Sequence, residues 1–382
     1  MPEVYLIAAV RTPIGVGKPQ SGALFPIAPI DLAAHVLQEV VRRGAVEPAL
    51  VEDVIMGCVT PVGDQGANIA RLATLKAGFP VAVPAVQLNR MCGSGQQAIH
   101  FAAQEILAGD MDLTIGGGIE MMSHQPLGSD YPSSWPADFP YELVHQGTSA
   151  EMMAEKYHLT RDQLDDFAYQ SHSRAGAAIQ DGRLAEQIAS VTVPEGQGGP
   201  RRIEHDQGVR IPPDRARMAS LAPAFKPDGV VTAGNSSQIS DGAGAVLLAS
   251  ERAVRQHGLK PMARLVARVA VGSDPVLMLD GPIPATRKIL DRVGLSIDEI
   301  DVIEINEAFA SVVLAWRAEI GADLEKVNPE GGAIAHGHPL GATGAILMTK
   351  LVHELRRRGG RYGLQTMCIG HGMATATVIE RL

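Results

Sequence analysis

Residues 89–98 read NRMCGSGQQA and form the turn that decides the fold. A short apolar segment that predicts a strand precedes them, and a helical pattern follows. A second stretch repeats this order, because Asn328 is followed by Gly331 and Gly332 and then by another helical pattern. Glycine permits the tight backbone turn between a strand and a helix. The two stretches therefore predict two similar halves, each built from strands and helices.

The rest of the chain alternates short segments rich in Val and Ile with longer helical patterns. Residues 50–55 (LVEDVI) and 297–303 (IDEIDVI) form a second pair of similar segments. Such alternation is typical of a layered α/β protein with a buried sheet. The predicted strands lie at 4–10, 51–59, 85–89, 112–117, 243–249, 263–271, 301–305 and 373–380, and the predicted helices lie at 31–43, 93–108, 160–181, 284–293, 307–320 and 341–358.

The middle of the chain lacks this periodicity. Residues 123–145 and 191–229 are rich in Pro, Gly, Ser and charge, and they predict long ordered loops on either side of the helix at 160–181. Long stretches without secondary structure inside a compact domain are usually functional. We expect this excursion to lie over a site.

Length and charge exclude several classes of protein. The chain has 382 residues, 46% of them hydrophobic, which is enough for two or three domains with a sizeable core. A net charge of −9 gives no overall basic surface for nucleic acid or anionic membrane. The sequence shows neither a secretory leader nor an apolar run of about 18 residues. These features predict a cytoplasmic protein without nucleic-acid or membrane partners.

The three cysteines, Cys58, Cys92 and Cys368, lack the CxxC spacing of zinc or dithiol sites. Cys92 precedes a predicted helix, where unpaired N–H groups would favour the nucleophilic thiolate and could hold an oxyanion. The alternative is that Cys92 is a small buried residue. Cys368 lies at a predicted strand end, followed by glycines at positions 370 and 372.

Two further motifs supply polar groups at turns. His338 lies in a glycine-rich stretch before a helix, and histidine is the natural base near neutral pH. The pair His336 and His338 also has the HxH spacing of metal ligands, but no third ligand is close in sequence, and we expect no metal. A phosphate-binding loop is disfavoured because its lysine is missing. Asn306 lies between a strand and a helix, and could simply cap that helix.

Together these motifs resemble the thiolase family, the acetyl-CoA C-acetyltransferases and 3-ketoacyl-CoA thiolases. The resemblance runs from Val4 to Leu382. It implies a duplicated αβαβα five-layer α/β fold with an inserted loop domain. The implied domains are an N-terminal thiolase domain at 1–118 and 231–256, a loop domain over the CoA site at 119–230, and a C-terminal thiolase domain at 257–382. The motifs that carry the resemblance are residues 9–13 (AVRTP), the cysteine turn, 231–235 (VTAGN), 306–309 (NEAF), 337–339 (GHP) and 368–370 (CIG).

The resemblance also implies the role of each reactive residue. Cys92 would take the acyl group, His338 would activate it, and Cys368 would move a proton at the α-carbon of acetyl-CoA. Asn306 would hold a water that stabilises the thioester enolate, while the N–H groups of Cys92 and Gly370 would form the other oxyanion hole. The implied reaction cleaves a 3-ketoacyl-CoA with CoA, or runs backwards as a Claisen condensation, in lipid metabolism such as fatty-acid β-oxidation.

Coenzyme A would be a co-substrate, with no permanently bound cofactor, and the protein would be a homodimer or homotetramer. Arginines in the loop region could form a basic rim for its phosphates. The residues expected to contact coenzyme A are His145, Arg210, Phe225, Ser237, Ala308 and Phe309, and the further rim arginines are Arg201, Arg202, Arg215 and Arg217.

Several positions depart from the short-chain members of the family. His371 stands where glycine is usual, beside the implied oxyanion hole, and Gln146 stands where methionine is usual. Residues 279–280 also differ, whereas 236–241 resemble thiolases of bulkier acyl chains, including steroid side chains. A condensing enzyme that uses an acyl-carrier protein is the alternative enzyme, but such enzymes pair the cysteine with two histidines. A non-catalytic relative is expected to lack at least one of the four reactive groups.

Overall fold

The computed structural model describes residues 3–194 and 199–382. Its strands are β1 (Val4–Arg11), β2 (Gly15–Val16), β3 (Asp53–Gly57), β4 (Ala85–Leu88), β5 (Leu113–Met121), β6 (Val191–Val193), β7 (Arg201–Ile203), β8 (Ser240–Ser250), β9 (Ala263–Gly272), β10 (Val302–Ile305), β11 (Tyr362–Ile369) and β12 (Met373–Arg381). Its α-helices are α1 (Pro29–Gly44), α2 (Ile69–Lys76), α3 (Ser94–Ala108), α4 (Gln146–Lys156), α5 (Arg161–Gln180), α6 (Arg215–Ala219), α7 (Glu251–His257), α8 (Pro282–Val293), α9 (Ala310–Ile320), α10 (Ala333–His336) and α11 (Leu340–Arg358).

The main sheet confirms the predicted repeat. Its strand order is β10-β11-β12-β9-β1-β8-β5-β3-β4, and β9 meets β1 through only two residue pairs. Outward from this seam, β1-β8-β5-β3 and β9-β12-β11-β10 show the same sequence of pairings, antiparallel, antiparallel and parallel. A parallel bridge between Ile303 and Val327 takes the place of the β3–β4 pair. The seam therefore joins two copies of one α/β arrangement.

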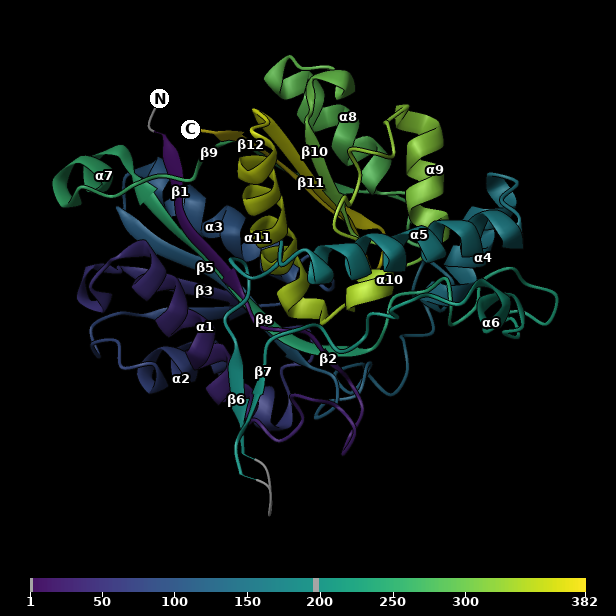
Figure 1. Cartoon of the computed structure of the whole chain (residues 1–382), viewed down its shortest axis with the longest axis horizontal. Helices are drawn as coiled ribbons and strands as arrows, with labels where there is room; N and C mark the ends of the chain where they lie inside the picture. Colours follow the sequence, from purple (N-terminus) through teal and green to yellow (C-terminus); the bar gives the residue numbers. More distant parts are fainter. Residues whose placement is uncertain (1–2, 195–198) are drawn as a thin grey trace.

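Helices complete five layers around the two halves of the sheet. Helices α3 and α11 lie between the halves, α1 and α2 cover one outer side, and α8 and α9 cover the other (Figure 1). The two central helices approach closely because both carry glycine at their second position. A Cβ atom on Gly95 would lie 2.7 Å from the Gly341 carbonyl oxygen, and one on Gly344 would lie 2.0 Å from the Gln96 nitrogen. Bare backbone at this crossing brings the first turns of α3 and α11 together.

One predicted boundary is wrong in a way that matters for the site. The helix predicted at 307–320 begins at Ala310, because residues 307–309 are not helical and Phe309 is extended. The Ala308 carbonyl accepts from Ser237 N–H at 2.9 Å, and Phe309 forms a bridge with Ser236. The Glu307 carboxylate is buried and accepts from Ser171 Oγ at 2.6 Å, which a first helical turn exposed to solvent would not allow.

The long middle loops contain more structure than the sequence pattern indicated. Residues 123–145 have neither helix nor strand, as predicted, but α4 begins at once after them. The loop predicted at 191–229 includes the β6–β7 hairpin and the short helix α6, while its residues 195–198 lie outside the described ranges. Helices α2 and α7 were not in the predicted set. Strand β11 is the strand that was predicted to end near Cys368.

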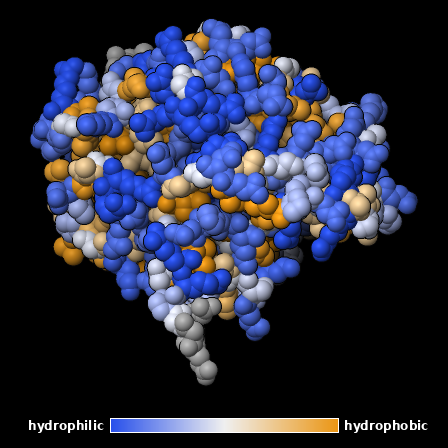
Figure 2. All heavy atoms as spheres, in the orientation of Figure 1, coloured by the Kyte–Doolittle hydropathy of each residue, from blue (hydrophilic) through white to orange (hydrophobic). Residues whose placement is uncertain are grey.

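The surface fits the charge pattern of the sequence. On the face seen in Figure 1, hydrophobic side chains appear in small separate areas among hydrophilic ones (Figure 2). Within the described ranges, no helix combines the length and apolar character needed to cross a bilayer.

Candidate active site

The four side chains predicted to react come from four turns, one in the first half and three in the second. Cys92 lies two residues before α3, and His338 lies two residues before α11, so they occupy equivalent places in the repeat. Asn306 directly follows β10, and Cys368 lies at the end of β11. All four are at most 5% exposed. The close crossing of the central helices carries the Cys92 and His338 turns into one buried region.

Burial dominates the ionisation of Cys92. It raises the pKa of the Cys92 thiol to about 11, although the N–H groups of Gly370 and of Cys92 itself face the sulfur and lower it. The predicted stabilised thiolate is therefore wrong for the free protein, in which the thiol is protonated near neutral pH. The two N–H groups come from different halves of the chain. Two N–H donors that point to one place are what an oxyanion hole requires.

Cys368 and His338 are also uncharged near neutral pH. Burial raises the pKa of the Cys368 thiol, and the nearby Cys92 raises it further, which makes the two sulfurs electrostatic neighbours. Burial lowers the pKa of His338 to about 4. The site therefore holds two thiols and a neutral imidazole in a region with little water.

Hydrogen bonds assign the tautomer of His338. Its Nδ1 lies 2.6 Å from Thr343 Oγ1, and that hydroxyl donates its only proton to the Pro339 carbonyl at 2.8 Å. Thr343 Oγ1 must therefore accept from Nδ1–H, because a hydroxyl has one donor. This leaves Nε2 with its lone pair, 3.3 Å from Asn306 Nδ2. The nitrogen that could act as a base is the one that faces the site.

Asn306 does not cap a helix. The first turn of α9 begins at Ala310, with Phe309 as its capping residue. Asn306 Oδ1 is buried and has no hydrogen-bond partner among the described residues. Buried amide oxygens are normally paired, so this atom has room for a bound water or a ligand group.

Buried charges hold the histidine turn in place. Asp206 accepts from both Nη1 and Nη2 of Arg11, at 2.8 and 3.0 Å, and its Oδ2 lies 2.7 Å from His336 Nδ1. The other ring nitrogen, His336 Nε2, lies 2.7 Å from the Glu330 carbonyl oxygen. Both ring nitrogens of His336 are therefore occupied by protein partners, and neither is free for a metal ion. Among the described residues, no group of three or more potential metal ligands is found.

A second buried carboxylate ties the two halves together. Glu120, at the end of β5, accepts from Val59 N–H at 2.8 Å, Thr60 N–H at 3.1 Å and Gly341 N–H at 2.8 Å. The Val59 and Thr60 amides belong to the loop after β3, whereas Gly341 lies in the first turn of α11. This carboxylate fixes the start of α11, and hence the His338 turn, against the first half.

Five of the six residues predicted to contact coenzyme A lie together. The His145 ring stacks on Phe225 with centroids 5.3 Å apart, and Phe225 meets the edge of Phe309 at 5.9 Å. Ser237 and Ala308 are joined by the backbone hydrogen bond described above. Arg210 is exposed, and its N–H donates to His172 of α5, without a described contact to this aromatic row.

The predicted basic rim is partly neutralised. Arg215 pairs with Asp162, Asp165 and Asp166, and Arg202 pairs with Glu204. These two arginines are therefore less available for phosphates than the sequence suggested.

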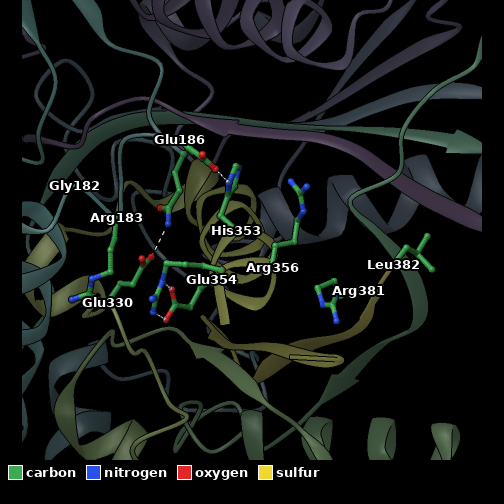
Figure 3. A pocket seen from close by; sticks show the side chains of 11 residues that line it. Gly182, Arg183, Glu186, Glu330, His353, Glu354, Arg356, Arg381 and Leu382 are labelled. Carbon is green, nitrogen blue, oxygen red and sulfur yellow. Dashed lines mark hydrogen bonds and ion pairs between the residues drawn. The ribbon is translucent and has the colours of Figure 1, made fainter. Parts of the chain in front are cut away.

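Two cavities lie in different parts of the molecule. One, of about 400 Å³, borders Gly370 and His371 and is walled by Tyr131 and Trp135, two residues that sequence reasoning did not select. A larger one, of about 520 Å³, is lined by charged residues near the C-terminal end of α11, among them His353 and Glu354 (Figure 3). His338 precedes the opposite end of this helix, roughly 20 Å away at 1.5 Å per residue. The smaller cavity is the one beside the reactive groups.

Comparisons with known proteins agree with this arrangement. The family model "Thiolase, N-terminal domain" matches residues 4–252, and "Thiolase, C-terminal domain" matches residues 259–381. The chain is 49% identical over 396 residues to steroid 3-ketoacyl-CoA thiolase FadA6 of Mycobacterium tuberculosis, covering 100% of this chain and 95% of that one. It is 42% identical over 404 residues to 3-oxoadipyl-CoA/3-oxo-5,6-dehydrosuberyl-CoA thiolase of Escherichia coli, covering 100% of both.

A solved structure shows the same fold over the whole chain. The crystal structure of Bacillus anthracis acetyl-CoA acetyltransferase superposes with a TM-score of 0.92 at 39% identity, covering 100% of this chain and 99% of that one. The family models match nearly all of the sequence, and this chain covers 95% or more of each relative's length. The chain therefore belongs to the thiolase family, the enzymes that transfer acyl groups between coenzyme A thioesters.

Proposed function

We propose that the protein cleaves 3-ketoacyl-CoA with CoA through an acyl-Cys92 intermediate, and that it catalyses the reverse Claisen condensation by the same ping-pong route. One observation supports this most strongly: the N–H groups of Cys92 and Gly370, one from each half, face the Cys92 sulfur. An acyl carbon bonded to that sulfur would place its oxygen where these donors converge.

In the first half-reaction, His338 Nε2 takes the proton of Cys92 as the sulfur attacks the 3-keto carbon. The bond between C2 and C3 breaks, and its electron pair forms the enolate of acetyl-CoA. The Cys368 thiol donates its proton to C2, while Asn306 and His338 stabilise the enolate oxygen. In the second half-reaction, CoA gives its thiol proton to Cys368, attacks the acyl-Cys92 thioester and releases Cys92, which recovers its proton from His338.

The aromatic row of His145, Phe225 and Phe309 is suited to an apolar pantetheine arm, with Ser237 and Ala308 beside it. Arg210, exposed at the rim, would meet the nucleotide phosphates. CoA would act as a co-substrate, without a bound cofactor. We further propose that residues 119–230 form a loop domain over this site, and that the enzyme is a cytoplasmic homodimer or homotetramer.

Intact-protein mass spectrometry after brief incubation with acetyl-CoA tests the intermediate. The wild type should gain one acetyl group, and Cys92→Ser should gain none. Cys58→Ala is the matched control, because Cys58 is also fully buried and follows β3 at the place that Asn306 holds after β10. Absence of an adduct on folded wild-type protein, or an adduct that persists in Cys92→Ser, would contradict the proposal.

A further inference from the structure

Aromatic side chains from two distant segments form one wall of the smaller cavity. Tyr131 and Trp135 come from the loop at 123–145, and His371 comes from the turn between β11 and β12. The His371 ring lies 6.2 Å from Tyr131 and 5.9 Å from Trp135 between centroids, the latter edge to face. Aromatic residues make up only 4% of the chain, so their gathering here is a local feature.

This cavity lies beside the turn that faces Cys92, although Cys92 itself does not line it. Gly370 lines it, and the Gly370 N–H faces the Cys92 sulfur. Burial and the nearby Cys92 raise the pKa of Tyr131, which places its hydroxyl within electrostatic reach of that sulfur. His145 also lines the cavity while it stacks on Phe225. The cavity and the proposed pantetheine path therefore meet near Cys92, and an acyl group on Cys92 would extend into the cavity.

The lining sets the chemistry of that acyl group. None of the described residues around the cavity is Lys, Arg, Asp or Glu, so no lysine or arginine there pairs with a second carboxylate on the acyl chain, and the polar side chains of the lining are those of Tyr131, His145, Gln146 and His371. A volume of about 400 Å³ lies in the range of sites for drug-sized ligands and far exceeds the needs of an acetyl group. Flat aromatic walls favour flat or ring-bearing partners, because offset and edge-to-face ring contacts add to the burial of apolar area.

His371 is held in an unusual backbone conformation for its side chain. Its φ is +63°, in the left-handed region that glycine adopts without steric cost. Its Nδ1 is buried and has no hydrogen-bond partner among the described residues. The ring is thus positioned by its contacts with Tyr131 and Trp135. Backbone strain that serves to place one side chain at a site is a feature of functional positions.

Building on the proposed thiolase function, we propose that this cavity selects 3-ketoacyl-CoA substrates with a bulky, uncharged, ring-bearing acyl group, and that His371 is a specificity-determining residue. The acyl ring packs against the Trp135 and His371 rings while its carbonyl carbon is bonded to Cys92. Straight chains of the same carbon number leave the rings of this wall partly uncovered. A terminal carboxylate loses its hydration there without a lysine or arginine to pair with.

Thiolysis kinetics test this assignment. We would compare kcat/KM for three 3-ketoacyl-CoAs of equal acyl carbon number: one ending in a cyclohexyl ring, one straight, and one ending in a carboxylate. The wild type should prefer the ring over the straight chain by about tenfold or more, in line with one or two ring contacts, and the carboxylate should be poorest. His371→Gly and Trp135→Ala should each lower the ring-to-straight ratio by about fivefold to tenfold.

The controls separate this inference from the proposed function. His371→Gly suits the local backbone, and Trp135 is 45% exposed, so both variants should fold. Tyr141→Ala is the matched control, because Tyr141 is an exposed aromatic of the same loop that does not line the cavity, and its ratio should stay at the wild-type value. If the wild type forms acyl-Cys92 and thiolyses all three substrates equally, or prefers the carboxylate, the specificity proposal is overturned while the function stands.

Light scattering tests whether the aromatic wall is a contact between copies of the chain. Tyr131 and Trp135 are also partly exposed, so this wall could instead be a contact between copies of the chain. A Trp135→Ala variant that changes the oligomeric state but keeps the wild-type ring-to-straight ratio would overturn the assignment to acyl recognition. Absence of both the adduct and thiolysis for every substrate would instead refute the proposed function.

Discussion

Replacing Asp206 by Asn removes the carboxylate that pairs with the buried guanidinium of Arg11 and with the buried imidazole of His336. Asp206 Oδ1 accepts from Arg11 Nη1 and from Ile14 N–H, both at 2.8 Å, and an asparagine oxygen can keep these two bonds. The NH₂ group of the asparagine would take the place of Oδ2. It is a donor, and it would face two other donors, Arg11 Nη2 and His336 Nδ1–H. Two bonds to a charged group are lost, each contributing about 1.5–3 kcal/mol.

We therefore expect Asp206→Asn to lower the free energy of unfolding by about 3–5 kcal/mol, the range found when a buried ion pair loses one partner. Urea unfolding at pH 7, followed by circular dichroism and by the fluorescence of the buried Trp316, measures this change. Asp166→Asn is the matched control. Asp166 also pairs with an arginine, Arg215 at 2.8 Å, but its side chain is 63% exposed, so the loss should stay below about 1 kcal/mol.

The pH dependence provides an independent check. Burial raises the pKa of Asp206, but the charge of Arg11 and the hydrogen bonds of His336 and Arg11 outweigh it, and the pKa lies below its usual range. A carboxyl with a lowered folded pKa stabilises the protein above its unfolded pKa, about 3.9, and loses this effect as the pH falls towards the folded value. The difference between wild type and Asp206→Asn should shrink as the pH falls below about 4. A difference no larger than that of the control, or one that grows on acidification, would refute the reasoning.

Three further predictions follow from the site and the helix crossing. Cys368→Ala should still form the acetyl adduct but should not exchange the α-hydrogen of acetyl-CoA for deuterium; retained exchange would show that Cys368 is not the acid/base. Because burial lowers the pKa of His338 to about 4, the rate of Cys92 acetylation should be level from neutral pH down to about pH 5 and fall by half near pH 4; a fall centred near pH 6.5 in stopped-flow mass spectrometry would contradict a buried neutral base. Gly344→Ala should destabilise the protein by about 3 kcal/mol or more, because its Cβ would overlap the backbone of α3 at 2.0 Å. Gly272→Ala, whose Cβ would meet its nearest neighbour at 4.0 Å, is the control and should change the free energy of unfolding by less than about 1 kcal/mol.

The turns that carry the reactive groups could be predicted because their signals are local. Glycines beside Cys92 and around His338 mark the turns before α3 and α11, and the repeated segments at 50–55 and 297–303 run into β3 and β10 at equivalent places. The structure confirms these turns. The roles of the side chains at them remain predictions that the experiments above address.

Features that depend on distant partners could not be predicted. Glu307 reads as the first turn of a helix, but its carboxylate is paired with Ser171, which is 136 residues away in sequence. The N-terminus of α3 suggests a thiolate at Cys92, whereas burial by the assembled halves raises its pKa. Likewise, the contact between His371 and Trp135 joins segments from opposite parts of the chain. In each case the local pattern is outweighed by tertiary packing.

The equivalence of the two halves bears on which side chains the equivalent turns of the site can carry. If the two halves were two identical chains, a substitution in the turn before one central helix would also be present in the turn before the other. A thiol in one turn would then always face a thiol in the other. Fusion of the halves into one chain removes that constraint. The place two residues before α3 holds Cys92, the same place before α11 holds His338, and the position after β3 holds Cys58 where Asn306 follows β10. Within a single chain, two structurally equivalent turns can thus carry side chains of different chemistry, here a thiol and an imidazole.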